Sequence, residues 1–339
     1  MKKMSSTKEN LHDRRIKKYV ELPSPDQIIP DIEGLVTNVT RRSLHSILEY
    51  TDDRLAVFVG PCSIHSESSA IEFAKRLKKL QKELPELLLI MRFFIQKPRT
   101  TVGWTGFLED PMMDESHDIV QGLRRTVGLV HKIVEEIGQP ICTELLGTTI
   151  EPQYFTNYLS AGFIGARTSE SQIHRNLASG LSFPIGIKNP SDGSAKVALQ
   201  GVIAARSPHS FCGIDVRGKI CAVHTTGNDD SFVVLRGSYK NGPNIVSGIK
   251  ELMSEKVGIV VDCAHGNSNK ISSQQCTNAL LAASFSRVCG IMLESHIKGG
   301  KQKAKPNADP NVSVTDPCLD WSSTELLLRT IATKRKKSK

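Results

Sequence analysis

Short apolar runs recur along this chain, and segments with helical spacing of apolar residues separate most of them. The runs are rich in β-branched residues and occupy residues 54–60, 87–94, 140–146, 163–167, 184–188, 231–237, 257–263 and 289–294. The separating segments include residues 69–84 and 119–136. Strands that alternate with helices form parallel sheets, and eight such units close into a barrel. The sequence therefore predicts an α/β fold, a (β/α)8 TIM barrel.

Two segments fall outside this alternation. Residues 1–45 begin with a polar, charged stretch and continue with several prolines, which predicts an N-terminal extension. Residues 211–228 contain two short alternating runs on either side of an Arg-Gly pair, which predicts an inserted β-hairpin. We expect the catalytic barrel over residues 46–330 and a basic tail over residues 331–339.

The composition indicates a globular protein that stays in solution. No apolar run approaches the roughly 20 residues that a bilayer span requires, and the charged N-terminus lacks the apolar core of a signal peptide. We therefore expect a cytoplasmic protein with no membrane partner. The eight cysteines include no CxxC pair, which argues against a zinc ribbon and against a disulfide scaffold.

The net charge of +9 raises the question of nucleic-acid binding. Much of the excess is terminal, as in residues 334–339, and the chain has only five Tyr and two Trp to stack on bases. We expect no nucleic-acid partner. A catalytically inactive barrel that binds a partner through its basic charge remains an alternative at this point.

The predicted carboxyl ends of the strands carry many cations. In barrels of this kind the loops after the strands converge on one face, where like charges repel unless anions fill the site. Guanidinium groups bind phosphate and carboxylate oxygens with two hydrogen bonds, and Lys supplies a compact charge. Substrates with several negative charges are implied. The cations are Arg92, Lys97, Arg99, Arg167, Lys188 and Arg236, and Arg92 in particular could instead pair with a neighbouring carboxylate.

A second group of strand-end residues combines a thiol, an imidazole and a carboxylate. Cys62, His265 and Glu294 follow or end runs that are neighbours around a closed barrel. This mixture of ligand types suits Mn, Fe, Co or Zn better than Mg or Ca. A fourth ligand is left open among Asp309, Asp316 and Asp320.

Longer motifs join these residues into a family pattern. They are GPCSIH (60–65), KPRTTVGW (97–104), GARTSESQIHRNLASGLSFPIGIKN (165–189), LRG (235–237), DCAHGNSNK (262–270), ESH (294–296) and SVTDPCLDW (313–321). Together they closely resemble the class I 3-deoxy-D-arabino-heptulosonate 7-phosphate (DAHP) synthases. The resemblance implies condensation of phosphoenolpyruvate with D-erythrose 4-phosphate and water, giving DAHP and phosphate. This is the first step of the shikimate pathway of aromatic amino acid biosynthesis.

The resemblance also implies a role for each strand-end residue. One divalent metal ion would be held by Cys62, His265, Glu294 and Asp316. Phosphoenolpyruvate would be bound by Arg92, Lys97, Arg167, Lys188 and Arg236. The sugar phosphate would be received by the segment Lys97-Pro98-Arg99-Thr100. Catalytic roles are expected for Lys97, Glu144, Lys188 and His265, with Lys188 or Glu144 handling the water that adds to C2 of phosphoenolpyruvate.

Relatives in this class use the N-terminal extension and the hairpin to bind an aromatic amino acid as a feedback inhibitor and to pair subunits. The positions that match the surroundings of that regulatory cavity are Pro152, Gln153, Phe211 and Gly213. Gly at 213 favours tyrosine as the inhibitor. We expect a homodimer or homotetramer.

A related enzyme is the alternative to this reading. The synthase of 3-deoxy-octulosonate 8-phosphate uses arabinose 5-phosphate on the same kind of barrel. The motif KPRTTVGW and the length of 339 residues argue against it.

Overall fold

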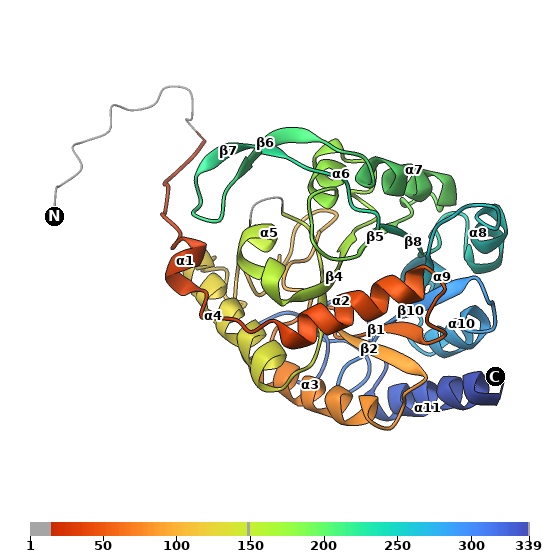
Figure 1. Cartoon of the computed structure of the whole chain (residues 1–339). Coiled ribbons are helices and arrows are strands. Elements are labelled where there is room, and N and C mark those ends of the chain that lie inside the picture. The colour runs from red at the N-terminus through yellow and green to blue at the C-terminus, as the bar shows by residue number, and fades with distance from the viewer. Residues whose placement is uncertain (1–14, 148–149, 338–339) are drawn as a thin grey trace, which may run out of the picture.

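The computed structural model describes residues 15–147 and 150–337. The first 14 residues of the expected extension and the last two of the expected tail lie outside this part. Within it, eight parallel strands close into a barrel in which each strand pairs with the next one along the chain (Figure 1). They are β1 (Leu55–Gly60), β2 (Leu87–Arg92), β3 (Ile141–Glu144), β4 (Leu159–Ile164), β5 (Ile185–Lys188), β8 (Phe232–Leu235), β9 (Ile259–Asp262) and β10 (Val288–Glu294). The predicted TIM barrel is confirmed.

The strands are apolar throughout because the barrel buries both of their faces, one against the interior and one against the helices. One strand lies elsewhere than predicted. The run at 163–167 was expected to be a strand, but β4 covers Leu159–Ile164 and leaves Arg167 in the loop that follows. The small residues at the start of β4 hid it, and Gly162 is required there, because a Cβ would lie 2.8 Å from Ile185 Cδ1.

Helices connect the strands and cover the outside of the barrel (Figure 1). They are α3 (Glu67–Gln81), α4 (Ile119–His131) with the π-helical turn η1 (Lys132–Glu136), α5 (Ile150–Phe155) with the 3-10 turn η2 (Thr156–Tyr158), α6 (Gln172–Ala178), α7 (Ala195–Ala205), α8 (Ile245–Glu251), α9 (His265–Ser268), α10 (Gln274–Ala282) and α11 (Trp321–Lys337). Side-chain caps fix some of their starts; the Ser66 hydroxyl, for example, accepts a hydrogen bond from Ser69 N. No helix in the described residues has the length and apolarity that a membrane crossing needs.

The amino-terminal end of the barrel is closed by a helix from the N-terminal segment. This segment contains α1 (Pro25–Ile28) and α2 (Leu35–Leu48), and α2 lies across the barrel in Figure 1. Leu44, Ile47 and Leu48 of α2 join the cluster of buried side chains that fills the barrel interior. Residue 45, the expected limit of the extension, therefore lies inside a helix that is packed on the barrel.

Four phenylalanines fill the barrel interior between α2 and the mouth, where the active-site cavity lies. Phe58 and Phe163 make an edge contact with ring centroids 5.0 Å apart, and Phe232 lies 6.2 Å from Phe58 and 5.9 Å from Phe163. Phe94 lies 6.4 Å from Phe163, on the side of the barrel mouth. The interior is therefore a packed core at this level rather than a channel.

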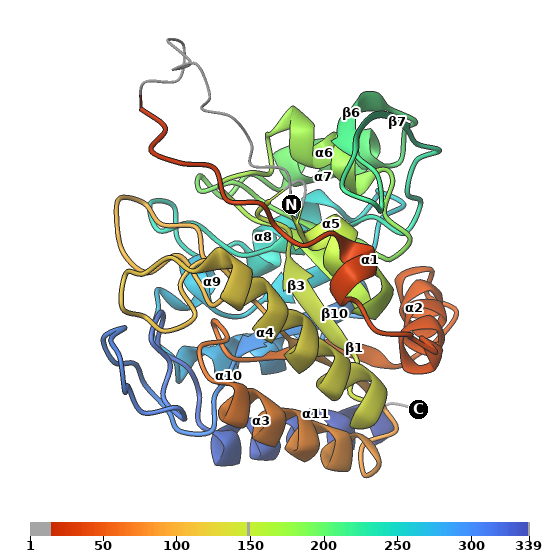
Figure 2. The ribbon, with the colours of Figure 1, turned by 90° about the vertical axis from the view of Figure 1, so that its left-hand side faces the viewer.

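The inserted hairpin lies outside the barrel proper. The hairpin pairs β6 (Ser210–Ile214) with β7 (Ile220–His224) as an antiparallel sheet, and Figure 2 shows it near α6, on the opposite side of the molecule from α3 and α11.

At the C-terminus, residues 331–337 continue α11 instead of forming a tail. Ile331 and Ala332 are buried there, because the helical spacing of apolar residues extends to Ala332.

Candidate active site

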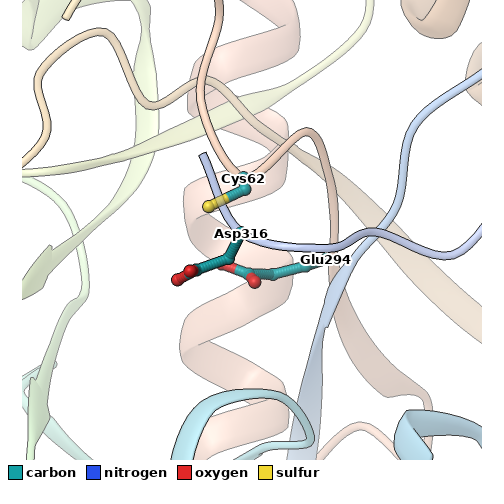
Figure 3. Close-up of side chains that lie close together, drawn as sticks. All are labelled: Cys62, Glu294 and Asp316. Atoms are coloured by element: carbon teal, nitrogen blue, oxygen red, sulfur yellow. The ribbon is translucent and has the colours of Figure 1, made fainter. Parts of the chain in front are cut away.

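The carboxyl ends of the strands bring three potential metal ligands together. Cys62 follows β1, Glu294 ends β10, and Asp316 lies in the loop between β10 and α11. One ligand atom from each lies within 4.8 Å of the other two, and the three side chains converge in Figure 3. Cys62 and Glu294 are buried, and Asp316 is partly buried.

The fourth expected ligand lies beside this group. His265 begins α9 with a φ of 51°, and its Nε2 is 3.6 Å from Glu294 Oε1. Its Nδ1 is 2.9 Å from Asp262 Oδ2. A carboxylate behind an imidazole is the usual arrangement that orients a metal-binding histidine. Asp262 was not singled out by the sequence, although the motif DCAHGNSNK contains it.

Of the three aspartates left open as a fourth ligand, only Asp316 reaches the group within the described residues. Asp309 instead forms an ion pair with Lys298 at 2.8 Å. Asp320 accepts a hydrogen bond from Ser323 N at 2.8 Å, near the start of α11.

The chemistry of the group fits a divalent cation. Two carboxyl groups and a thiol converge in a largely buried space, where negative charges repel one another strongly. Burial raises the pKa of the Cys62 thiol, and the neighbouring Glu294 carboxylate raises it further. A divalent metal stabilises the thiolate and offsets this repulsion, and mixed sulfur, nitrogen and oxygen ligands suit a transition metal or zinc.

A cavity of about 360 Å³ opens next to these residues. Its lining includes nine of the site residues expected from the sequence, namely Lys97, Arg99, Thr100, Glu144, Arg167, Lys188, Arg236, His265 and Asp316. It also includes Tyr239, Lys270 and Lys301, which the sequence analysis did not single out. Lys270 belongs to a quoted motif, whereas no sequence signal pointed to Tyr239.

Arg92 occupies a different place from the other expected cations. Its side chain is fully buried and does not line the cavity. Its Nη2 forms an ion pair with Glu294 Oε1 at 3.1 Å. The pairing with a carboxylate that the sequence left open for Arg92 is therefore what the structure contains.

The cations at the cavity have polar partners nearby. Lys188 Nζ lies 3.1 Å from Asp262 Oδ2, and Lys97 Nζ donates to the backbone oxygen of Cys62 at 3.1 Å. Burial raises the pKa of Glu144, but the charges of Lys188 and Lys97 outweigh that effect, so the pKa lies below its usual value. Glu144 is therefore ionised at neutral pH.

Two loops meet across the cavity. Arg167 Nη2, after β4, donates to Thr100 Oγ1, after β2, at 3.1 Å. Lys270 Nζ lies 2.9 Å from Asp316 Oδ1, which ties the loop after β9 to the candidate metal group. The cationic cavity and the candidate metal group are thus parts of one site.

Three of the four expected regulatory residues line a second cavity of about 270 Å³. Gln153 of α5 and Phe211 and Gly213 of β6 contribute to it, together with Ile29 from the N-terminal segment. Gln153 Nε2 donates to Ile214 O at 2.8 Å and so joins α5 to the hairpin. Pro152 belongs to α5 as well.

A TIM barrel that joins a candidate metal group to a cationic cavity at its mouth defines an enzyme of anionic substrates. Residues 35–329 match the model of the DAHP synthetase I family. The chain belongs to this family.

Similar proteins carry names that agree with this assignment. A phospho-2-dehydro-3-deoxyheptonate aldolase of Saccharomyces cerevisiae, named as phenylalanine-inhibited, is 41% identical over 96% of this chain and 94% of its own length. One of Candida albicans, named as tyrosine-inhibited, is 41% identical over 93% of this chain and 92% of its own. The solved aldolase of Francisella tularensis superposes with a TM-score of 0.90 at 37% identity, covering 95% of this chain and 98% of that one.

These findings establish the activity. The chain is a transferase that condenses phosphoenolpyruvate with erythrose 4-phosphate and water to give DAHP and phosphate.

Proposed function

We propose that this condensation takes place in the cavity at the barrel mouth, with one divalent metal ion beside it. The observation that carries the proposal is that the cationic cavity and the convergent Cys62, Glu294 and Asp316 share one site. The cations match the charges of two phosphorylated substrates, one of which also carries a carboxylate.

Phosphoenolpyruvate binds, on this proposal, between the loops after β2, β4, β5 and β8. Lys97, Arg167 and Arg236 from these loops, and Lys188 from the end of β5, all line the cavity and supply positive charge. Arg92 acts from below the cavity, where its ion pair with Glu294 fixes that carboxylate. Any direct contact of Arg92 with substrate requires its guanidinium to move, because its side chain has no exposed surface.

The aldehyde sugar binds over the segment Lys97-Pro98-Arg99-Thr100, all of which lines the cavity. Its phosphate pairs with the guanidinium of Arg99. The hydrogen bond from Arg167 to Thr100 links the two substrate subsites.

The metal site is assigned to Cys62, His265, Glu294 and Asp316, and the metal to Mn, Fe, Co or Zn. When bound there, a Lewis-acidic ion polarises the aldehyde oxygen for attack by C3 of phosphoenolpyruvate. Neighbouring residues position two of these ligand side chains. Asp262 orients His265 through its contact with Nδ1, and Arg92 holds Glu294 in place.

Proton transfer to and from the added water is assigned to Lys188 and Glu144. Glu144 is ionised, so its carboxylate is able to accept a proton from water that attacks C2. Lys188 lies against Asp262 and is able to donate a proton. Replacing Lys188 by Met separates the roles, because a proton-transfer role predicts an altered pH profile of kcat. An unaltered profile with most of the rate retained would refute it.

The proposal is tested by phosphate release from phosphoenolpyruvate with either erythrose 4-phosphate or arabinose 5-phosphate. Release is expected with the four-carbon sugar and is expected to be far slower with the five-carbon sugar. Chelation is expected to abolish the reaction, and individual divalent metals to restore it. Full activity after complete metal removal would end the proposed role of the metal.

The second cavity is assigned to an aromatic amino acid that inhibits the enzyme. Its position between α5, the hairpin and the N-terminal segment supports this, because α5 follows β3, which ends at Glu144 in the active site. Gly213 favours tyrosine, since a Cβ there would lie 2.9 Å from Val223 Cγ2 and reduce the space. Inhibition curves with each aromatic amino acid test the assignment, and equal inhibition of a Phe211→Ala variant would contradict it.

Subunits are proposed to pair as a homodimer or homotetramer. Exposed apolar side chains on the N-terminal segment and the hairpin support this, including Tyr19, 79% exposed, and Ile220, 88% exposed. Analytical ultracentrifugation of the full chain distinguishes monomer, dimer and tetramer.

A further inference from the structure

Three cations of the active site surround one aromatic ring. Phe94 is two residues beyond the end of β2, and only 1% of its surface is exposed. The guanidinium carbon of Arg92 lies 4.0 Å from the centre of its ring. The ammonium nitrogens of Lys97 and Lys188 lie 5.8 Å and 5.9 Å from the same centre. All three distances are within the range of cation–π attraction.

The ring also packs against another aromatic side chain. Phe163 lies against it with a centroid distance of 6.4 Å, and Phe163 is itself packed on Phe58 and Phe232. The backbone oxygen of Phe94 accepts a hydrogen bond from Ile64 N at 2.8 Å. The ring therefore keeps its orientation unless the aromatic cluster below it moves.

An aromatic neighbour has a particular advantage in an anion site. Three cations held close together repel one another, and a carboxylate that offsets this repulsion also cancels the field that attracts substrate. The face of a neutral ring attracts cations without changing the net charge of the site. Arg92 pairs with the Glu294 carboxylate and Lys188 with that of Asp262. The Phe94 ring attracts all three cations in addition, without adding a negative charge to the site.

We propose that Phe94 is a positioning residue for phosphoenolpyruvate. Its ring holds the ammonium groups of Lys97 and Lys188, which line the cavity, and the buried guanidinium of Arg92 in place before the substrate arrives. This inference rests on the proposed function of the cavity and extends it to a residue that the sequence presents only as part of an apolar strand.

The first test replaces Phe94 by Leu, which keeps the residue apolar and removes the aromatic face. The KM for phosphoenolpyruvate is expected to rise about tenfold, the change that follows from losing a desolvated cation–π contact. The KM for erythrose 4-phosphate is expected to rise by less than the KM for phosphoenolpyruvate, since only Lys97 among the three cations also belongs to the segment that receives the sugar. Phe232→Leu is the matched control, because Phe232 belongs to the same aromatic cluster and makes ring contacts with Phe58 and Phe163.

A second variant keeps the shape of the ring. Pentafluorophenylalanine at position 94 fills the same space, but its face no longer attracts cations, because the fluorines reverse the ring quadrupole. The same rise in KM for phosphoenolpyruvate is expected, with a melting temperature close to that of the unmodified chain. An unchanged KM in this variant would overturn the proposal, as would equal KM changes in the Phe94→Leu and Phe232→Leu variants.

Binding without turnover separates this inference from the proposed function. The increase in melting temperature that phosphoenolpyruvate alone produces is measured for each variant. A wild-type chain that binds phosphoenolpyruvate but releases no phosphate with erythrose 4-phosphate would refute the proposed function. Protection of the Phe94→Leu variant at the same phosphoenolpyruvate concentrations as the wild type would refute the role of Phe94.

Discussion

The two ends of the barrel interior are built from the same strands but from opposite kinds of side chain. At the amino-terminal end of the strands, which we call the base, Phe58, Phe163 and Phe232 pack together in one cluster with side chains of α2. At the mouth, the interior carries ionisable groups instead. The change occurs over two residues on a single strand, as from Val260 to Asp262 on β9.

The alternation of strand side chains explains this sharp change. Residues two apart on a strand face the same side of the sheet, so the inward positions form successive layers. Met292 lies in the aromatic layer, and Glu294, the next inward residue of β10, lies in the site. Stability at the base comes from packing, whereas stability at the mouth depends on keeping buried charges paired. The two ends should therefore respond differently to substitution.

The largest effect is expected for Glu294→Gln at the mouth. The variant loses a proposed metal ligand, and several kcal/mol of Lewis-acid stabilisation correspond to a fall of about 10³-fold or more in kcat/KM. It also leaves the buried Arg92 without its carboxylate, which costs about 3–5 kcal/mol of unfolding free energy. Phosphate-release kinetics and denaturant unfolding measure the two effects.

Asp309→Asn is the matched control for Glu294→Gln. Asp309 is another acid on the mouth side, but it pairs with Lys298 at the surface, where solvent screens the pair, so little stability and no activity should be lost. A Glu294→Gln variant that kept more than a tenth of the wild-type activity would show that the group does not hold a required metal.

The complementary substitution at the base is Phe163→Ala. Its ring is fully buried among Phe58, Phe94 and Phe232, so the variant should lose about 3–5 kcal/mol of unfolding free energy. Below its melting temperature, kcat should stay within about twofold of the wild type, because no ionisable group is removed. Urea unfolding and steady-state kinetics at low temperature provide the test. A tenfold fall in kcat in the folded variant would mean that base and mouth are not separable.

Much of this division could be predicted from the sequence. Strands buried on both faces are recognisable as apolar runs, and polar residues at their ends identify the mouth. The motifs identified Cys62, His265, Glu294 and Asp316 through a resemblance. The base was less visible, since a phenylalanine in an apolar run gives no sign of which face of the strand it occupies.

The errors and omissions have physical causes. The strand β4 was placed too late because small residues such as Gly162 carry no apolar signal, although packing requires them. The pairing of Arg92 with Glu294 joins residues 202 positions apart, and only the closure of the barrel brings them together. Asp262 and Tyr239 take their importance from what lies next to them in space, which a single sequence does not contain.

A smaller effect is expected where two loops meet above the mouth. Thr100→Val removes the hydroxyl that accepts a hydrogen bond from Arg167. Loss of about 0.5–1.5 kcal/mol should raise the KM for one or both substrates by roughly twofold to tenfold, with little change in stability. Thr101→Val is the control, because Thr101 lines the same cavity from the adjacent position. Equal KM values in the two variants would show that the contact does not order the site.

The smallest effect is expected for an exposed ion pair at the base. His45 Nδ1 on α2 lies 2.5 Å from Asp230 Oδ1, and the two side chains are 54% and 31% exposed. The hydrogen bond with Asp230 raises the pKa of His45 above its ordinary value of 6.5. The protonated form is therefore stabilised by folding, and this contribution is complete below pH 6.5 and disappears as the pH rises through the raised pKa.

His45→Gln should therefore lose less than about 1 kcal/mol at low pH, since solvent screens the pair, and nothing at high pH. A double-mutant cycle with Asp230→Asn, measured by urea unfolding at about pH 5.5 and 8.5, isolates this coupling. A coupling as large as that expected for Arg92 and Glu294, or one that grew with pH, would contradict the contrast between the two ends. A small coupling confined to low pH would locate the important charge pairs of this barrel at its mouth, because burial there prevents water from replacing a lost partner.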